Sequence, residues 1–285
     1  MSTAELQATI DGAWEAREGV TAGTKGEVRD AVDAALDALD GGSLRVAEKT
    51  NGRWRVHQWL KKAVLLSFRL NDMSEIENGP GDAAWWDKIP SKFAGWDEAR
   101  FRAAGFRAVP TCVVRRSAYV APGVVLMPSF VNVGAYVDSG TMIDTWSTVG
   151  SCAQIGKKCH ISAAAQIGGV LEPIGALPVI IEDEVLVGGN SGVYEGTVVK
   201  KRAVLGSGTI LNRSTPVYDV VTGKVHAASG GEPLVVPENA VVVAGSRAIS
   251  QGRGREWNLS LYTPVIVKYR DAKTDAKAQL EDLLR

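Results

Sequence analysis

The hydrophobic positions of this chain follow two periods, and the change falls near residue 107. Before it, apolar side chains recur every three or four positions, as on one face of an amphipathic helix. This spacing predicts helices over residues 4–17, 26–39 and 58–70. Asn51 and Gly52 separate two short alternating segments and predict a β-hairpin turn. Residues 78–90 are rich in Gly, Pro and Trp and are expected to form a loop.

Beyond residue 107, one aliphatic residue recurs at every sixth position. Eight of these residues are in phase: Val125, Val131, Val137, Ile143, Val149, Ile155, Ile161 and Ile167. After an interruption at residues 169–180, the spacing continues with Ile181, Val187, Val193, Val199, Leu205, Leu211 and Val217. Helices and strands have shorter periods, so a period of six requires another geometry. A three-sided coil provides it, because each side is a short strand that directs one aliphatic side chain inward.

Stacked coils of this kind form a parallel β-helix. The two phased blocks predict about five coils, which end near residues 236–246. Small or turn-forming residues directly follow many of the inward aliphatics, and we interpret them as the corners of the coils. Because a solenoid needs covered ends, we expect an α+β fold. Its domains would be a mainly helical region over residues 1–106, the β-helix over 107–246, and a strand and helix over 247–285.

The composition narrows the class of function. Of the 285 residues, 45% are hydrophobic and 22% are charged, and Lys plus Arg balance Asp plus Glu at 32 each. Without a basic excess, a nucleic-acid-binding function is disfavoured. The chain shows no signal-peptide pattern and no apolar run near the ~18 residues of a membrane span, so we expect a cytoplasmic protein. Its cysteines lack a CxxC spacing and its histidines are too scattered for a zinc site, so we expect reduced thiols and no metal.

Four sequence blocks resemble one family of acyltransferases. They are LRVAEKTNGRWRVHQWLKKAVLLSFRLND (44–72), WDKIPSKFAGWDEARFRAAGFRAVP (86–110), VLMPSFVNVGAYVDSGTMIDTWSTVGSCAQIGKKCHIS (125–162) and IGGVLEP (167–173). In these blocks, and over about residues 5–285, the chain resembles the tetrahydrodipicolinate N-succinyltransferases. The resemblance implies a left-handed β-helix, small-molecule substrates, and a homotrimer with acyl-CoA sites between neighbouring prisms. The implied reaction transfers succinyl from succinyl-CoA to the amine of ring-opened tetrahydrodipicolinate, in lysine and diaminopimelate biosynthesis.

Acyl transfer to an amine needs a group that takes the amine proton, and cationic partners for the substrate carboxylates. By position alone, Asp144, Glu195 and Arg107 are solvated corner or surface side chains. The resemblance implies that Asp144 orients the amine and that Glu195 is a second catalytic carboxylate, and it leaves open which is the base. It also implies that Arg107 binds a substrate carboxylate. Trp146 is either a platform over the substrate or a packing residue between subunits, and His160 is a rival base.

No glycine-rich phosphate loop is present, so CoA is expected to lie along the late coils. Three glycines there allow a close approach and are the candidate cofactor-binding residues, namely Gly188, Gly206 and Gly208. We interpret the basic residues 200–202 as a solvated turn rather than a phosphate site. The chain departs from the family at Gly189, Asn190 and Gly192, where the family usually has Ala, Arg and Glu. Two alternatives stay open: a sister enzyme that uses acetyl-CoA, and a β-helix scaffold without catalysis.

Overall fold

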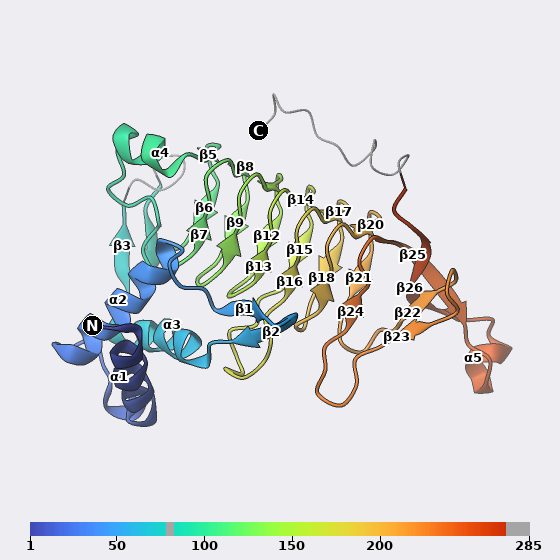
Figure 1. Ribbon diagram of the computed structural model, residues 1–285, viewed down its shortest axis with the longest axis horizontal. Coiled ribbons are helices and arrows are strands. Elements are labelled where there is room, and N and C mark those ends of the chain that lie inside the picture. Colours follow the sequence, from blue (N-terminus) through green and yellow to red (C-terminus); the bar gives the residue numbers. More distant parts are fainter. Residues whose placement is uncertain (78–82, 272–285) are drawn as a thin grey trace.

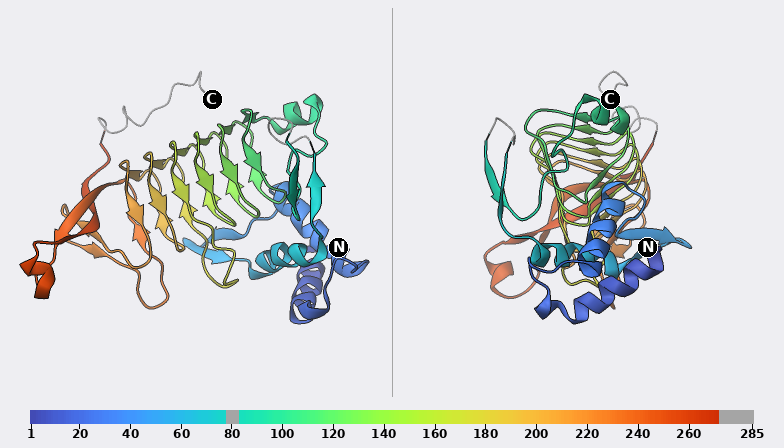
Figure 2. Two further views of the ribbon diagram at one scale, coloured as in Figure 1. Left: turned by 180° about the vertical axis from the view of Figure 1, so that it is seen from behind. Right: turned by 90° about the vertical axis from the view of Figure 1, so that its left-hand side faces the viewer.

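The centre of the molecule is a three-sided parallel β-helix (Figure 1). The computed structural model describes residues 1–77 and 83–271. N-terminal helices lie beside the first coils, and a two-stranded ribbon extends from the last coil (Figures 1 and 2). Residues 107–236, all of them described, form six complete coils with one short strand per wall. We number the walls in the order in which the chain visits them.

Each wall is a stack of six parallel strands, one from each coil. The first wall consists of β5 (Arg107–Ala108), β8 (Val125–Leu126), β11 (Met142–Ile143), β14 (His160–Ile161), β17 (Leu186–Val187) and β20 (Val204–Leu205). The second wall consists of β6 (Val113–Val114), β9 (Phe130–Val131), β12 (Thr148–Val149), β15 (Gln166–Ile167), β18 (Gly192–Val193) and β21 (Ile210–Leu211). The third wall consists of β7 (Tyr119–Val120), β10 (Tyr136–Val137), β13 (Gln154–Ile155), β16 (Ile180–Ile181), β19 (Val198–Val199) and β24 (Val235–Val236).

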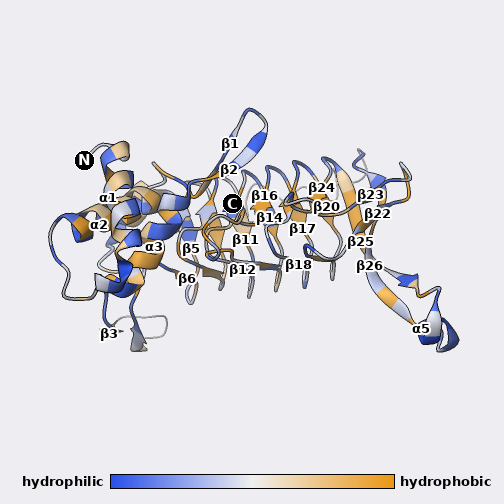
Figure 3. Cartoon of the chain, turned by 90° about the horizontal axis from the view of Figure 1, so that it is seen from below, coloured by the Kyte–Doolittle hydropathy of each residue, from blue (hydrophilic) through white to orange (hydrophobic). Residues whose placement is uncertain are grey.

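The second residue of each wall strand points into the prism, as the six-residue period predicts. Along the first wall, Ile143, Ile161 and Val187 pair in register and are fully buried. Figure 3 shows apolar strands in orange and polar turns in blue along the prism. Burying one such aliphatic side chain contributes roughly 1.5–3 kcal/mol. The inward column is therefore the main source of stability of the prism.

The structure corrects three details of the predicted coils. In the first wall Leu126, and not Val125, pairs with Ile143, because that coil is one residue shorter than the regular repeat. The inward phase extends back to Ala108, and the described chain has six coils instead of about five. Val217 belongs to β22 (Val217–Asp219), which pairs with C-terminal strands and not with a wall strand.

The turns between walls also differ from the prediction. We call the turns from the first to the second wall the first corner, those from the second to the third wall the second corner, and the remaining ones the third corner. The residue directly after the inward aliphatic still bonds to the next coil, and the left-handed residue comes two positions later. In the first corner these left-handed residues are Trp146, Ala164, Asn190 and Gly208, with φ between 56° and 74°. A left-handed residue gives the sharp reversal that a tight corner needs.

The N-terminal region forms a second core against the prism. Its helices are α1 (Thr3–Glu15), the short η1 (Arg17–Gly19), α2 (Glu27–Asp40), α3 (Gln58–Leu70) and α4 (Glu98–Ala104). The three predicted helices are confirmed to within two residues. The predicted hairpin is formed by β1 (Ala47–Thr50) and β2 (Arg53–Val56), and it packs on the third wall at Ile180 and Val198. Where a loop was predicted, β4 (Trp85–Asp87) pairs with β3 (Ser74–Ile76).

A C-terminal ribbon continues the first wall. It consists of β25 (Ala240–Ala248) and β26 (Ser260–Tyr269), which are connected through α5 (Gly252–Glu256) and flanked by β22 and β23 (Val225–His226). The strand β25 pairs with β20 and so attaches the ribbon to the prism. The predicted terminal helix lies outside the described residues. Among the described helices, none has the length and apolar composition needed to cross a bilayer.

Candidate active site

The residues that follow the first-wall strands stack into one column along the first corner. Each donates its backbone N–H to a carbonyl of the next coil at 2.7–2.9 Å. From the third coil onward the column consists of Asp144, Ser162, Gly188 and Gly206. At a rise of about 4.8 Å per coil, Gly188 lies about 10 Å and Gly206 about 14 Å from Asp144. The fold therefore places one candidate carboxylate and two candidate glycines on the same edge.

Asp144 lies beside His160 in this corner. Its Oδ1 accepts the backbone N–H of Thr145 at 2.6 Å, and its Oδ2 lies 3.5 Å from Nε2 of His160. The side chains of Asp144 and His160 are 28% and 18% exposed. Among the described residues, the buried Nε2 has no hydrogen-bond partner. The histidine that was expected as a rival base is thus placed behind the carboxylate, which is the more accessible of the two.

Trp146 projects from the same corner. It adopts a left-handed conformation with φ of 60°, and its backbone N–H donates a hydrogen bond to the Pro128 carbonyl at 2.6 Å. The residue is 74% exposed and lines a depression of about 410 Å³ together with Phe130 and Trp85. Trp85 is 50% exposed. Exposed apolar groups that gather around a depression are typical of a surface that contacts a ligand or another chain.

The three candidate glycines lie on this corner for different structural reasons. A Cβ added at Gly188 would lie 2.5 Å from a backbone nitrogen of the next coil, so close packing of the coils requires glycine there. At Gly206 the corresponding nearest distance is 3.3 Å. Gly208 is the left-handed corner residue with φ of 74°, and a Cβ there would meet open space. Beyond Asp144 the first corner is therefore lined mainly by backbone.

Arg107 lies on the outer surface of the first wall, at the start of β5. It pairs with Val125, and Met142 and His160 follow in the same outward column. Two coils, or about 10 Å, separate Arg107 from Met142. The arginine is exposed and stands on the wall that leads into the Asp144 corner. Arg107 and Asp144 therefore border the same side of the prism.

Glu195 lies in the second corner. Glu195 and the following Gly196 are both left-handed, with φ of 53° and 70°. The Oε2 of Glu195 accepts the backbone N–H of Arg213, one coil later, at 2.9 Å. Glu195 borders an open cavity of about 1640 Å³, whose lining includes the β1–β2 hairpin and residues 168–177. Asp144 and Glu195 are thus held at opposite ends of the second wall, and one chain does not bring them together.

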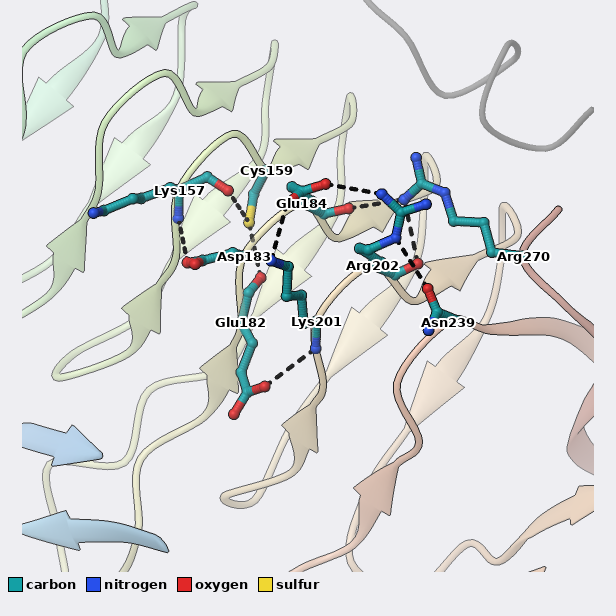
Figure 4. Close-up of polar contacts among 9 residues, drawn as sticks. All are labelled: Lys157, Cys159, Glu182, Asp183, Glu184, Lys201, Arg202, Asn239 and Arg270. Carbon is teal, nitrogen blue, oxygen red and sulfur yellow. Dashed lines mark hydrogen bonds and ion pairs between the residues drawn. The ribbon is translucent and has the colours of Figure 1, made fainter. Parts of the chain in front are cut away.

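The third corner is a ladder of ion pairs (Figure 4). Glu184 accepts a hydrogen bond from Arg202 at 3.1 Å and lies 3.3 Å from Nζ of Lys201. Arg202 also donates to Asn239 at 3.0 Å, and Arg270 donates to the Glu184 carbonyl at 3.1 Å. Burial raises the pKa of Glu184, but its contacts with Lys201 and Arg202 outweigh this and leave the pKa below its ordinary value. The basic segment therefore stabilises stacked coils and is more than a solvated turn.

The three cysteines lie in the interior, where they contribute to packing. Cys112, Cys152 and Cys159 are all buried and free. Burial raises the pKa of the Cys112 thiol to about 11 and those of the other two to about 12. Such thiols are protonated and weakly nucleophilic at neutral pH. In the described residues, no group of three His, Cys, Asp or Glu side chains is arranged to hold a metal ion.

Known proteins match the chain over its full length. The family model of the tetrahydrodipicolinate N-succinyltransferase N-terminal region matches residues 5–70, and that of the hexapeptide repeat of succinyl-transferase matches residues 178–213. A 2,3,4,5-tetrahydropyridine-2,6-dicarboxylate N-succinyltransferase of Nitrobacter hamburgensis is 60% identical and is covered completely, as is this chain. This chain belongs to the tetrahydrodipicolinate N-succinyltransferase family. A family member from Rhodospirillum rubrum is 58% identical, over 100% of this chain and 99% of its own.

One solved structure supports the fold. The crystal structure of a Campylobacter jejuni protein, assigned as a 2,3,4,5-tetrahydropyridine-2-carboxylate N-succinyltransferase, superposes with a TM-score of 0.56 at 15% identity. The match covers 90% of this chain and 65% of that chain. At this identity the likeness shows the fold alone.

Sequence reasoning did not single out one aromatic residue that lines the cavity beside Glu195. Tyr194 borders the same cavity as Glu195, and its ring lies over Gly168 and Gly192. The available signal was the pair of glycines, which are one coil apart around the second wall. The partnership of His160 with Asp144 was likewise hidden, because it depends on the register of neighbouring coils.

Proposed function

We propose that this protein transfers the succinyl group of succinyl-CoA to the amine of ring-opened tetrahydrodipicolinate. Water opens the cyclic imine, and the amine nitrogen then attacks the thioester carbonyl carbon. The C–N bond forms, the C–S bond breaks, the amine loses a proton and the CoA thiolate gains one. The products are N-succinyl-2-amino-6-oxopimelate and CoA, in lysine and diaminopimelate biosynthesis. The full-length identity of 60% to a relative named for this reaction carries the proposal.

Asp144 is the proposed base and orients the amine. The Thr145 N–H fixes one carboxylate oxygen, and the other oxygen faces His160 and the solvent. His160 has the less exposed side chain of the pair, which favours Asp144 as the group that meets the substrate. A positioned general base typically contributes about 10²–10⁴-fold to the rate. Arg107 is proposed to bind a substrate carboxylate, because its guanidinium presents two parallel donors to the two carboxylate oxygens.

We further propose a homotrimer of left-handed prisms in which the first corner of one chain faces the second corner of the next. This arrangement would bring Glu195 to the Asp144 of a neighbour, whereas one chain keeps them a full wall apart. The exposed Trp146 and Trp85 support it, because packing against a neighbour would remove large apolar side chains from water. In this arrangement Trp146 also forms part of the wall of the substrate site.

The pantetheine arm of CoA is proposed to lie along the first corner beyond Asp144. Gly188, Gly206 and Gly208 leave the backbone accessible there, and the first two lie on the column that begins at Asp144. A CoA thioester whose carbonyl reaches Asp144 would have its arm extend over these coils. The proposed enzyme is cytoplasmic and uses no resident metal.

The test of the function is a parallel assay with two acyl donors. The purified protein is mixed with tetrahydrodipicolinate and either succinyl-CoA or acetyl-CoA, and thiol release and product mass are measured. We expect release of CoA with succinyl-CoA and a product with the mass of N-succinyl-2-amino-6-oxopimelate. Faster turnover of acetyl-CoA would instead support the sister enzyme. If neither donor released thiol, the result would support a β-helix scaffold without catalysis and would contradict the proposed function.

A further inference from the structure

The ring of Tyr194 occupies space that two absent side chains leave empty. A Cβ added at Gly192 would lie 2.4 Å from Cε2 of the Tyr194 ring and 2.6 Å from its hydroxyl oxygen. A Cβ added at Gly168 would lie 2.8 Å from Cδ1 of the same ring. Real Cβ atoms do not approach this closely, so the ring can hold this position only while residues 168 and 192 are glycine, and a Cβ at either one would displace it. The two glycines are thus a seat that fixes the ring against the second wall.

This seat places the phenol on the outer surface of the second wall. Gly192 is the first, outward residue of β18, and it pairs with Gln166 on one side and Ile210 on the other. The Tyr194 hydroxyl therefore lies over the wall that connects the Asp144 corner with the Glu195 corner. Within the described residues, no group forms a hydrogen bond with this hydroxyl. Its donor is available to a ligand.

The Tyr194 hydroxyl can donate one hydrogen bond to a ligand that reaches this wall. A carboxylate oxygen is a suitable acceptor, because hydrogen bonds to ionised groups are shorter and stronger than those between neutral groups. Both reactants of the proposed reaction carry carboxylates: one at the end of the succinyl group and two on the acceptor.

We propose that Tyr194 is a specificity-determining residue that binds a substrate carboxylate through its hydroxyl, with Gly168 and Gly192 as its seat. The inference rests on the proposed function. It predicts that the hydroxyl, and not only the ring, contributes to turnover. It also predicts that the position of the ring matters, because the donor must reach a fixed carboxylate.

The first experiment removes the oxygen alone. Tyr194→Phe keeps the ring on its seat, and we expect kcat/KM with succinyl-CoA to fall about 10- to 100-fold, the usual range for a hydrogen bond to a charged group. Tyr119→Phe is the matched control: it removes a hydroxyl from the third wall, and its kinetics should equal those of the unaltered protein. Thermal melts of both variants should agree with the unaltered protein. Unaltered kinetics of Tyr194→Phe would overturn the inference while leaving the proposed function intact.

The second experiment identifies the carboxylate. Butyryl-CoA resembles succinyl-CoA but lacks the terminal carboxylate. If Tyr194 binds the donor, Tyr194→Phe lowers the preference for succinyl-CoA over butyryl-CoA about tenfold or more. If it binds the acceptor, both donors are affected equally and the KM for the acceptor rises at least tenfold. An equal loss with both donors and an unchanged KM for the acceptor would exclude carboxylate binding.

The third experiment moves the ring and keeps the oxygen. In Gly192→Ala the added methyl group displaces the Tyr194 ring, so we expect a loss of kcat/KM of at least fivefold in the same direction as for Tyr194→Phe. The double variant Gly192→Ala with Tyr194→Phe should lose little more than either single variant, because both changes remove the same contact. Fully multiplicative losses would show two independent effects and would contradict the seat.

Discussion

Replacement of Asp219 by Asn is expected to weaken the attachment of the C-terminal ribbon in a pH-dependent manner. The Asp219 side chain is fully buried. Its carboxylate accepts the N–H groups of Val221 at 2.9 Å and Thr222 at 3.1 Å, the Thr222 hydroxyl at 2.6 Å, and the Tyr269 hydroxyl at 2.7 Å. These contacts join β22 to β26. His226 lies behind the carboxylate, with its Nε2 3.8 Å away.

The magnitude follows from the pKa of this carboxyl. Burial by itself raises the pKa of Asp219, but the hydrogen bonds from Thr222 and Tyr269 outweigh burial and lower the pKa from 3.8 to about 2. A difference of about 1.8 pKa units corresponds to roughly 2.4 kcal/mol. Because the folded-state pKa is depressed, this stability is fully present above the unfolded-state value of 3.8. It is lost as the pH falls through the folded-state value, and about 1 kcal/mol is gone by pH 3.

The assay compares the free energy of unfolding of the unaltered protein and Asp219→Asn by urea titration at fixed protein concentration, from pH 7 to pH 3. We expect the difference between them to be constant at pH 5–7 and to shrink by roughly 1 kcal/mol at pH 3. Hydrogen exchange should locate the loss in β22 and β26. A difference that stays the same over the whole pH range, or protection unchanged in both strands, would refute the reasoning.

The remaining predictions concern the site. Asp144→Asn and Glu195→Gln should each lower kcat at least tenfold without lowering the melting temperature. Asp138→Asn, a third-corner Asp whose Oδ1 likewise accepts the next backbone N–H, is the control and should keep full activity; near-normal turnover of both site variants would remove these assignments. Arg107→Ala should raise the KM for the dicarboxylate with a smaller effect on kcat, and an unchanged KM would exclude Arg107 from the site. His160→Gln should lower kcat severalfold at constant KM because it loosens Asp144, and equal changes in both constants would argue against this positioning role.

Local chemistry was enough to predict the wall strands of the prism, the first three helices and the hairpin between them. The six-residue spacing of residues such as Ile143 and Ile161 specified the prism, because only a three-sided coil buries one aliphatic per side at that period. The helical spacing in the first seventy residues and the Asn51-Gly52 turn specified the N-terminal elements in the same way. These features depend on residues that are close in sequence, so they can be predicted from the sequence alone.

The register of the coils could not be predicted from the sequence. A coil with one residue fewer moved the inward position from Val125 to Leu126, and the sequence pattern tolerated both, since adjacent aliphatic residues occupy the site. The corner residue was also misplaced, because backbone hydrogen bonding to the next coil decides where the left-handed turn falls. At Trp146 a non-glycine residue adopts this conformation, which composition alone does not predict.

The same distinction between sequence and structure applies to the candidate site. Through its resemblance to the family, the sequence predicted which side chains carry the chemistry: Asp144 and Glu195 as carboxylates, and Arg107 as a cation. These roles stay predictions. Only the tertiary structure decided that His160 lies behind Asp144, that Glu195 belongs to another corner, and that the Tyr194 ring lies over two glycines. The physical reason is that a solenoid brings together residues one coil apart, and insertions between walls set that distance. An insertion leaves the residue types unchanged, so these are visible in the sequence. The contacts between coils form only when the chain folds into the β-helix.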